Sequence, residues 1–132
     1  MKIKEGKCIC STVQYTVGLD DNPKMYKCHC IDCRKGAGSS FVTLIEFKLE
    51  SLKINESKLD SFTYQSGSGK DLKRYFCKTC KVPVYLYVEK YNINYIYAGL
   101  LDEINDIQLS KNINFDNSHF PFLNIKEKNI II

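Results

Sequence analysis

Residues 27–35 read Lys27-Cys28-His29-Cys30-Ile31-Asp32-Cys33-Arg34-Lys35 and place three cysteines in a C-x-C-x2-C pattern. Packing alone does not require such density, because an unreactive thiol behaves as a small buried hydrophobe. Three thiols this close together can hold one soft metal ion from three sides. We therefore take Cys28, Cys30 and Cys33 as the centre around which the chain is organised.

The other four of the seven cysteines form a C-x-C at Cys8 and Cys10 and a C-x2-C at Cys77 and Cys80. Structural zinc takes four ligands in a tetrahedron, and four cysteines are a common set. We expect these thiolates to form one closed zinc site, which would close a loop of roughly 70 residues and stabilise the fold as a cross-link does. The spacing leaves open a pairing of Cys8 and Cys10 with cysteines of the first cluster instead.

The three-cysteine set lacks one donor, and three protein ligands with one open position are the arrangement of catalytic zinc. Three thiolates make zinc electron-rich and a poor activator of water. A thiol suits such a site better, because a soft thiolate completes the tetrahedron and is held deprotonated. A metal-held thiolate is a nucleophile. The set therefore indicates addition of a small-molecule thiol to a small aldehyde, or the reverse cleavage.

Residues beside the cluster are candidates for positioning the substrate, and we single out Arg34, Ser39 and Ser40. The small residues 36–40 either bring backbone amides close to a ligand or form a flexible connector. His29 points away from its cysteine neighbours if the segment is extended, which favours a surface or packing role over a ligand role. His119 has no partner visible in the sequence.

The composition fits one globular domain, residues 1–132, with 44% apolar and 26% charged residues. No run approaches the roughly 18 to 20 apolar residues of a membrane span, and no secretory signal is visible. We expect a cytoplasmic protein, because clustered cysteines in reducing compartments more often bind metal than form disulfides.

The formal charge of +4 is weak evidence for a nucleic-acid partner. Seven thiolates and two divalent ions would bring that charge down to about +1. The best basic cluster is interrupted by Asp71 and is interpreted as a solvated face; it consists of Lys70, Lys73, Arg74, Lys78 and Lys81.

The rest of the chain predicts a mainly β fold. Residues 13–17 alternate apolar and polar side chains, and a strand that extended back from them would place Cys8 and Cys10 on one face. The C-x2-C at 77–80 is typical of a tight turn between two strands. No segment has a helical apolar repeat over ten or more residues, so one short helix or turn after Cys30 is the most we expect. Further strands are predicted at 41–47, 52–54, 61–65, 84–88, 94–98 and 113–115.

Taken together, these motifs resemble the glutathione-dependent formaldehyde-activating (GFA) family, which includes centromere protein V. Two later segments, residues 98–102 and Pro121-Phe122, are similar to that family's Gly-x-Leu-Asp and Pro-Trp. Ser11 and Lys81 depart from it, since each stands where the family has glycine. The resemblance is carried by Gly6-x-Cys8-x-Cys10, Val13-x-Tyr15, Cys28-His29-Cys30-x-x-Cys33-Arg34-Lys35-x-x-Gly38-x-x-Phe41 and Arg74-x-Phe76-Cys77-x-x-Cys80.

The resemblance implies a β-tent of stacked, coiled antiparallel sheets with zinc knuckles and little helix. It implies a catalytic zinc on the three-cysteine cluster, and a structural zinc on Cys8, Cys10, Cys77 and Cys80. The family's activity is that of a carbon–sulfur lyase, which joins glutathione and formaldehyde into S-hydroxymethylglutathione. Glutathione is therefore the implied co-substrate.

The leading hypothesis is a zinc-dependent carbon–sulfur lyase that acts on a thiol and an aldehyde. A rival is a non-catalytic module in which both zinc ions only hold the fold and a surface engages protein or nucleic acid. The lack of a basic tail or stripe counts against nucleic acid. A third reading is a thiol–disulfide redox protein that uses Cys77 and Cys80.

Overall fold

The computed structural model describes residues 1–67 and 69–113, and strands dominate this part of the chain. It contains one α-helix, α1 (Ile31–Ala37), and the short 3-10 helices η1 (Leu49–Ser51), η2 (Glu56–Lys58), η3 (Glu89–Tyr91) and η4 (Ala98–Leu100). None of the helices in these residues has the length and apolarity to cross a bilayer. The strands are β1 (Lys2–Lys7), β2 (Gln14–Leu19), β3 (Met25–Cys28), β4 (Val42–Phe47), β5 (Leu52–Ile54), β6 (Leu59–Gln65), β7 (Asp71–Cys77), β8 (Pro83–Val88), β9 (Ile93–Tyr97) and β10 (Leu109–Ile113).

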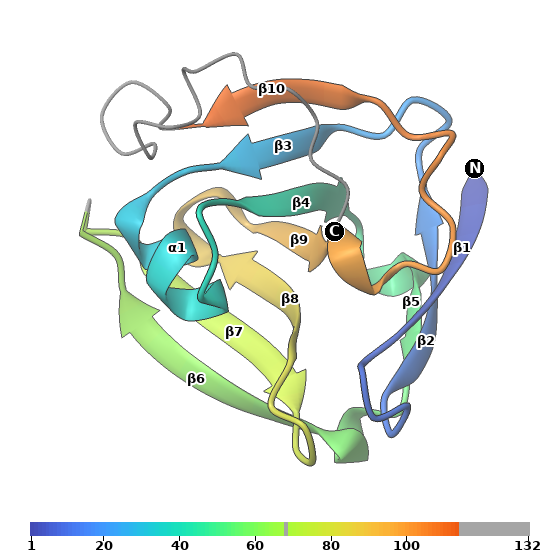
Figure 1. Ribbon diagram of the computed structural model, residues 1–132, viewed down its shortest axis with the longest axis horizontal. Helices are drawn as coiled ribbons and strands as arrows, with labels where there is room; N and C mark the ends of the chain where they lie inside the picture. Colours follow the sequence, from blue (N-terminus) through green and yellow to red (C-terminus); the bar gives the residue numbers. More distant parts are fainter. Residues whose placement is uncertain (68, 114–132) are drawn as a thin grey trace, which may run out of the picture.

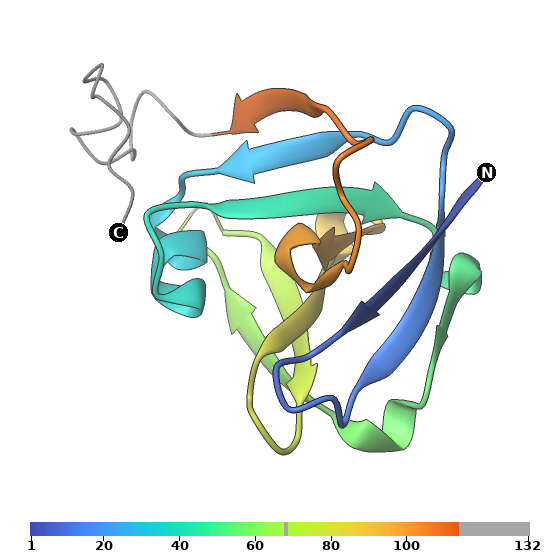
Figure 2. The ribbon, with the colours of Figure 1, turned by 45° about the vertical axis from the view of Figure 1, so that its right-hand side comes forward.

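The strands form two sheets. A three-stranded sheet has the order β1-β2-β5, and a seven-stranded sheet has the order β10-β3-β4-β9-β8-β7-β6. Figure 1 shows the larger sheet curving from β10 at the top to β6 at the bottom, with α1 on one side and the smaller sheet on the other. Figure 2 shows β1 and β2 crossing in front of the larger sheet. The expectation of stacked, mainly antiparallel sheets with little helix is confirmed, although β10 joins β3 in parallel.

The larger sheet has a hydrophobic core on each face, because neighbouring residues of a strand point to opposite sides. Ile45 and Ile96 are paired and belong to the core shared with the smaller sheet, which also contains Tyr15 of β2. Their neighbours Leu44 and Tyr97 are also paired and belong to a second core. Cysteines of the N-terminal turn and of the β7–β8 turn join the first core, whereas those around α1 join the second.

The N-terminal segment differs from the prediction. The alternation of residues 13–17 is confirmed, since Val13, Tyr15 and Val17 are buried. However, Cys8 and Cys10 lie in the turn between β1 and β2 and not on a backward extension of β2, so that expectation was wrong. Strand β1 itself was not predicted, because its lysine-rich sequence lacks an apolar face.

Strand β3 was not predicted either, whereas the other strands follow the predicted ones closely. The 52–54 strand is confirmed as β5, and the C-x2-C lies between β7 and β8 as expected. Gly36 and Ala37, predicted as loop, are the last two residues of α1. The final strand was predicted at 113–115, and within the described residues β10 spans Leu109–Ile113. Asn114, Phe115, His119 and Pro121-Phe122 lie outside the described residues.

Candidate active site and metal centres

The first candidate metal centre joins two turns that are 67 residues apart in sequence. Four sulfur atoms lie within 4.8 Å of one another, and no His or carboxylate belongs to this group among the described residues. The Sγ of Cys10 is 3.5 Å from that of Cys8 and 3.7 Å from that of Cys77. The group consists of Cys8, Cys10, Cys77 and Cys80.

The two turns differ in size by one residue, but in each the residue after the second cysteine donates its amide to the carbonyl of the first cysteine. In the first, the amide of Ser11 donates to the carbonyl of Cys8 at 3.1 Å; in the second, the amide of Lys81 donates to the carbonyl of Cys77 at 2.9 Å. Ser11 has φ 64° and Lys81 has φ 66°, so both adopt the left-handed conformation that favours glycine. Glycine, which stands at these positions in the family that the sequence resembles, would adopt this conformation without strain.

Backbone amides point at the sulfur atoms of this centre. Amides of Val13 and Thr79 donate to the Sγ atoms of Cys8 and Cys77, each at 3.3 Å. The Thr12 side chain, 3.1 Å away, and the Thr12 amide lower the pKa of Cys10 to about 6. Donors of this kind stabilise thiolate, which is the form that binds metal.

The second candidate centre is built at the junction of β3 and α1. Cys28 ends β3, Cys30 is the N-cap of α1, and Cys33 lies in the first turn of the helix. The Cys30 Sγ accepts a hydrogen bond from the Cys33 amide at 3.3 Å and lies 3.5 Å from the Cys28 Sγ. An N-cap side chain folds over the third helical residue, and this brings the two thiols of a C-x2-C together. All three sulfur atoms lie within 4.8 Å of one another.

The thiols of this cluster differ in acidity. Hydrogen bonds from Cys28 and Cys33 lower the pKa of Cys30 far below that of a free thiol. Correspondingly, the pKa of Cys28 is raised to about 11, first because of its hydrogen bond to Cys30. Cys30 is therefore the sulfur that accepts hydrogen bonds from both of the others, and it is also the most exposed of the three.

The donor sets fit zinc. A tetrahedral Zn–S bond of about 2.3 Å separates two sulfur ligands by about 3.8 Å. The observed separations of 3.5 to 3.7 Å are close to that value. All seven cysteines are free thiols, and soft sulfur donors select zinc over hard cations. One group has the four donors of a closed site, and the other has three.

Arg74 of β7 is partly buried against α1, the helix that carries Cys33, which corrects its interpretation as part of a solvated basic face. Its Nε donates to the hydroxyl of Tyr97 and its Nη2 to the hydroxyl of Tyr64, each at 3.1 Å. Its guanidinium also packs against Gly36, which lies three residues after Cys33 on the same side of α1. Partial burial works to lower the pKa of Arg74, but Tyr97, Tyr64 and Cys33 raise it overall, so the guanidinium keeps its charge.

A surface hollow of about 210 Å³ lies over this arginine. Helix α1 contributes one wall and β6 and β7 the other. The hollow carries two cations and one carboxylate, and the carboxylate of Asp32 already accepts the amide of Gly67 at 3.1 Å. The lining residues are Asp32, Lys35, Gly36, Phe62, Tyr64 and Arg74.

The candidate substrate contacts named from sequence are less central. Arg34 lies on α1, and its carbonyl accepts the capping amides that end the helix. Ser39 is exposed and Ser40 is partly buried just beyond the cap. His29 is buried, 1% exposed, with its ring 5.4 Å from that of Phe41, and belongs to neither sulfur group.

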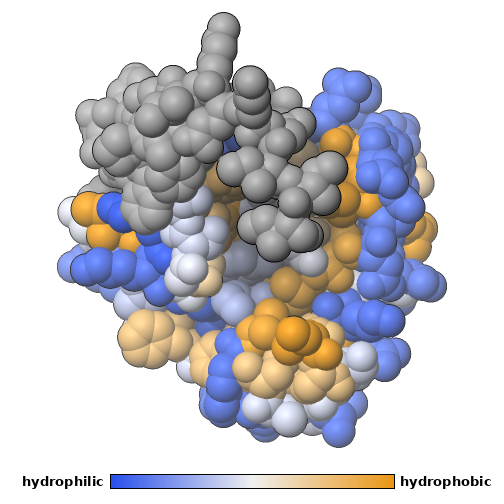
Figure 3. Space-filling model, in the orientation of Figure 1, coloured by the Kyte–Doolittle hydropathy of each residue, from blue (hydrophilic) through white to orange (hydrophobic). Residues whose placement is uncertain are grey.

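The outer surface gives little sign of a second function in this region. Figure 3 shows hydrophilic residues along the rim over β1 and β2, and apolar residues at the lower edge, where the two cysteine-bearing turns lie. Ile9, between the cysteines of the first turn, is 84% exposed. A single exposed apolar side chain of this kind is ordinary on a protein surface.

Comparison with known proteins agrees with the sulfur geometry. Residues 3–117 match the family model described as "Glutathione-dependent formaldehyde-activating enzyme". A curated protein of Schizosaccharomyces pombe, named "Uncharacterized lyase C29B12.13", is 27% identical over 113 residues, which cover 85% of this chain and 78% of the relative.

A solved structure supports the fold. The crystal structure of a Rhodobacter sphaeroides protein superimposes with a TM-score of 0.59 at 20% sequence identity. The match covers 83% of this chain and 99% of that one. At this identity the likeness concerns the arrangement of the strands.

Proposed function

This chain belongs to the family of glutathione-dependent formaldehyde-activating enzymes, and on that premise we propose that it is a zinc-dependent carbon–sulfur lyase. The proposed substrates are a small-molecule thiol, with glutathione as the first candidate, and a small aldehyde such as formaldehyde. A reducing compartment such as the cytoplasm suits this role, because the seven cysteines are needed as free thiols.

The two sulfur groups would have different roles, one structural and the other catalytic. Cys8, Cys10, Cys77 and Cys80 would hold a structural zinc and so tie the β1–β2 turn to the β7–β8 turn. Cys28, Cys30 and Cys33 would hold the catalytic zinc. When bound there, zinc supplies a soft Lewis acid that keeps a thiol ligand deprotonated at neutral pH.

The reaction is an addition across the carbonyl. A carbon–sulfur bond forms between the thiol sulfur and the aldehyde carbon, the carbonyl π bond breaks, and the thiol proton ends on the new hydroxyl. The lyase direction reverses these steps, so no oxidant or reductant is consumed. The part of the protein is to hold the sulfur as thiolate at a fixed position beside the aldehyde.

Arg74 has the chemistry of a positioning residue for an anionic thiol. Hydrogen bonds to the hydroxyls of Tyr64 and Tyr97 hold its guanidinium in place. None of the ion pairs found among the described residues involves Arg74. A guanidinium can bind a carboxylate with two parallel hydrogen bonds. We therefore place a carboxylate of the thiol substrate in the hollow over Arg74 and Lys35.

The observation that carries the proposal is the three-sulfur cluster, to which residues 1–67 and 69–113 contribute no fourth donor. A purely structural site gains nothing from a vacant position, because four thiolates saturate zinc. Three thiolates with one position to fill are the arrangement that lets a substrate sulfur bind.

Exchange of glutathione with its formaldehyde adduct tests the proposal, and NMR exchange spectroscopy can follow it. Because the adduct also forms without protein, the quantity to measure is the exchange rate with and without the zinc-loaded chain. We expect a faster exchange with wild-type protein and the uncatalysed rate with Cys30→Ser. A rate that wild-type protein leaves unchanged would refute lyase activity toward this pair.

A further inference from the structure

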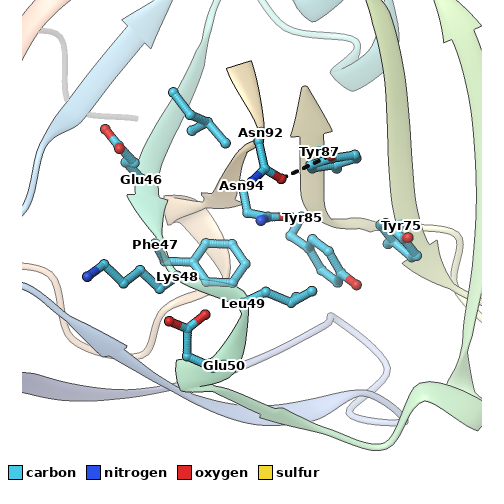
Figure 4. A pocket seen from close by; sticks show the side chains of 11 residues that line it. Glu46, Phe47, Lys48, Leu49, Glu50, Tyr75, Tyr85, Tyr87, Asn92 and Asn94 are labelled. Carbon is cyan, nitrogen blue, oxygen red and sulfur yellow. Dashed lines mark hydrogen bonds between the residues drawn. The ribbon is translucent and has the colours of Figure 1, made fainter. Parts of the chain in front are cut away.

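A second cavity of about 520 Å³ lies on the other face of the seven-stranded sheet from the three-cysteine cluster. Strands β4, β7, β8 and β9 form its floor, and η1 lies at one side (Figure 4). This volume is within the range that binds small organic molecules. Neither sulfur group contributes a residue to its lining.

Asn94 lies at the centre of this lining. Its side chain is only 9% exposed, and none of the described residues gives it a side-chain hydrogen bond. Figure 4 shows its amide between Phe47 on one side and Tyr85 and Tyr87 on the other. The strand register agrees, because Asn94 pairs with Phe47 of β4 and with Tyr87 of β8. Because Asn94 lines the cavity and makes no side-chain hydrogen bond to the described residues, its amide donor and acceptor are available to a ligand bound there.

Aromatic rings form the walls around this amide. The rings of Tyr75 and Tyr85 stack at 4.2 Å with an interplanar angle of 12°, and Phe47 meets Tyr85 edge-on at 5.8 Å. Tyr87 is fixed by donating its hydroxyl to Asn92 at 3.0 Å. Rigid rings arranged in this way suit a planar ligand, which can stack on one face or contact an edge.

The charges at the mouth do not favour an anion. Glu46, Lys48 and Glu50 line it, so carboxylates outnumber ammonium groups. Figure 4 shows the carboxylate of Glu46 and the amine of Lys48 directed away from the rings. The inner part is therefore uncharged, and the Asn94 amide, a donor beside an acceptor, is its central polar group.

We propose that this cavity binds a planar, uncharged ring with an amide-type edge, the class that includes nucleobases and aromatic carboxamides. The edge would pair with the Asn94 amide through one donated and one accepted hydrogen bond, as asparagine does with adenine. The ring would lie against the tyrosines. The site is separate from the sulfur chemistry and does not depend on the proposed lyase activity.

NMR titration of the nitrogen-15-labelled full chain tests this proposal, with uracil and nicotinamide as probes. We expect saturable shifts of the Asn94 side-chain amide signals, with the millimolar affinity of ligands of this size. The matched control is N,N-dimethylnicotinamide, which keeps the ring and the carbonyl but has no N–H donor, and it should bind at least tenfold more weakly. No shift of Asn94 with either probe, or equal binding of the dimethyl compound, would overturn the proposal.

The Asn94→Leu variant provides the second measurement. Leucine has a similar size without the amide, so the variant should lose the probe and also unfold at a higher temperature than wild type. The control Asn22→Leu, in an exposed turn, should leave probe binding unchanged. A lower unfolding temperature in Asn94→Leu, or undiminished binding, would show that the amide serves the fold and would refute the proposal.

Discussion

A β-carbon at Gly36 would collide with the guanidinium of Arg74, so any residue with a side chain at this position would force the arginine to move. Glycine within a helix ordinarily costs about 1 kcal/mol relative to alanine. In this helix, however, glycine allows β7 to bring a charged side chain up to α1, one turn beyond Cys33. The contact therefore connects the helix that carries Cys33 to the hollow that Arg74 lines.

Gly36→Ala should lower stability, contrary to ordinary helix propensity. The new methyl group would displace the guanidinium from the hydroxyls of Tyr64 and Tyr97. Loss of these bonds should exceed the gain in propensity, so we expect a net loss of about 1 to 2 kcal/mol in denaturant unfolding. In an Arg74→Ala background the same substitution should stabilise the protein, because the guanidinium that the new methyl group would displace is absent. Stabilisation in both backgrounds would contradict the contact.

Substitution of Arg74 should impair the use of an anionic thiol. We expect Arg74→Gln to reduce kcat/KM for glutathione by about tenfold to a hundredfold, as lost charge-assisted bonds do. Arg74→Lys should be intermediate, because it keeps the charge but not the planar fork. The control substrate is 2-mercaptoethanol, which has no carboxylate and should be used equally well by all three proteins. An equal loss with both thiols would assign Arg74 to the fold or to the cluster.

The sequence predicted those strands whose pattern is local. The alternation in residues 13–17 and the apolar residues of 52–54 are explained by their own side chains. Strand β1 is different, because tertiary contacts hold it. It pairs with β2, and Lys4, 9% exposed, donates to the Oδ1 of Asp106 at 2.6 Å. A charged residue buried by a distant ion pair has no local signal.

The candidate site likewise contains residues that a local pattern predicts and one that only tertiary contacts reveal. Spacing was enough to suggest both sulfur groups, since C-x-C and C-x2-C are short-range motifs. Arg74 was missed because lysines surround it in sequence. A signal was nevertheless present, because in a strand Arg74 shares a face with Leu72 and Phe76. An arginine on an otherwise apolar face is a better candidate for a functional role than one among lysines.

Glycine at the two left-handed positions should stabilise the chain. Ser11 and Lys81 adopt φ values near 65° that cost a side-chain-bearing residue roughly 1 kcal/mol. Ser11→Gly and Lys81→Gly should therefore each raise stability by about 0.5 to 1 kcal/mol, and together by about twice that. Calorimetry of the metal-loaded proteins would measure this. Lys78→Gly, in the same turn without a positive φ, is the control and should destabilise.

Removal of single cysteines should separate the two metal centres. Wild-type protein purified without chelator should contain about two zinc ions per chain, and Cys30→Ser and Cys77→Ser about one each. Loss of zinc from the two centres should affect stability differently. Cys77 is fully buried and belongs to the sulfur group that joins the two turns, so Cys77→Ser should lose several kcal/mol of stability.

Cys30→Ser should keep the fold, because serine is itself a good N-cap and α1 also packs against β4. Its thermal unfolding should lie within a few degrees of wild type while thiol exchange falls to the uncatalysed rate. A strong chelator should likewise abolish activity before it unfolds the protein, since an open three-donor site releases its ion more readily than a closed one. If Cys30→Ser unfolds as readily as Cys77→Ser, both centres are structural, and the rival reading of a zinc-stabilised binding module is the better one.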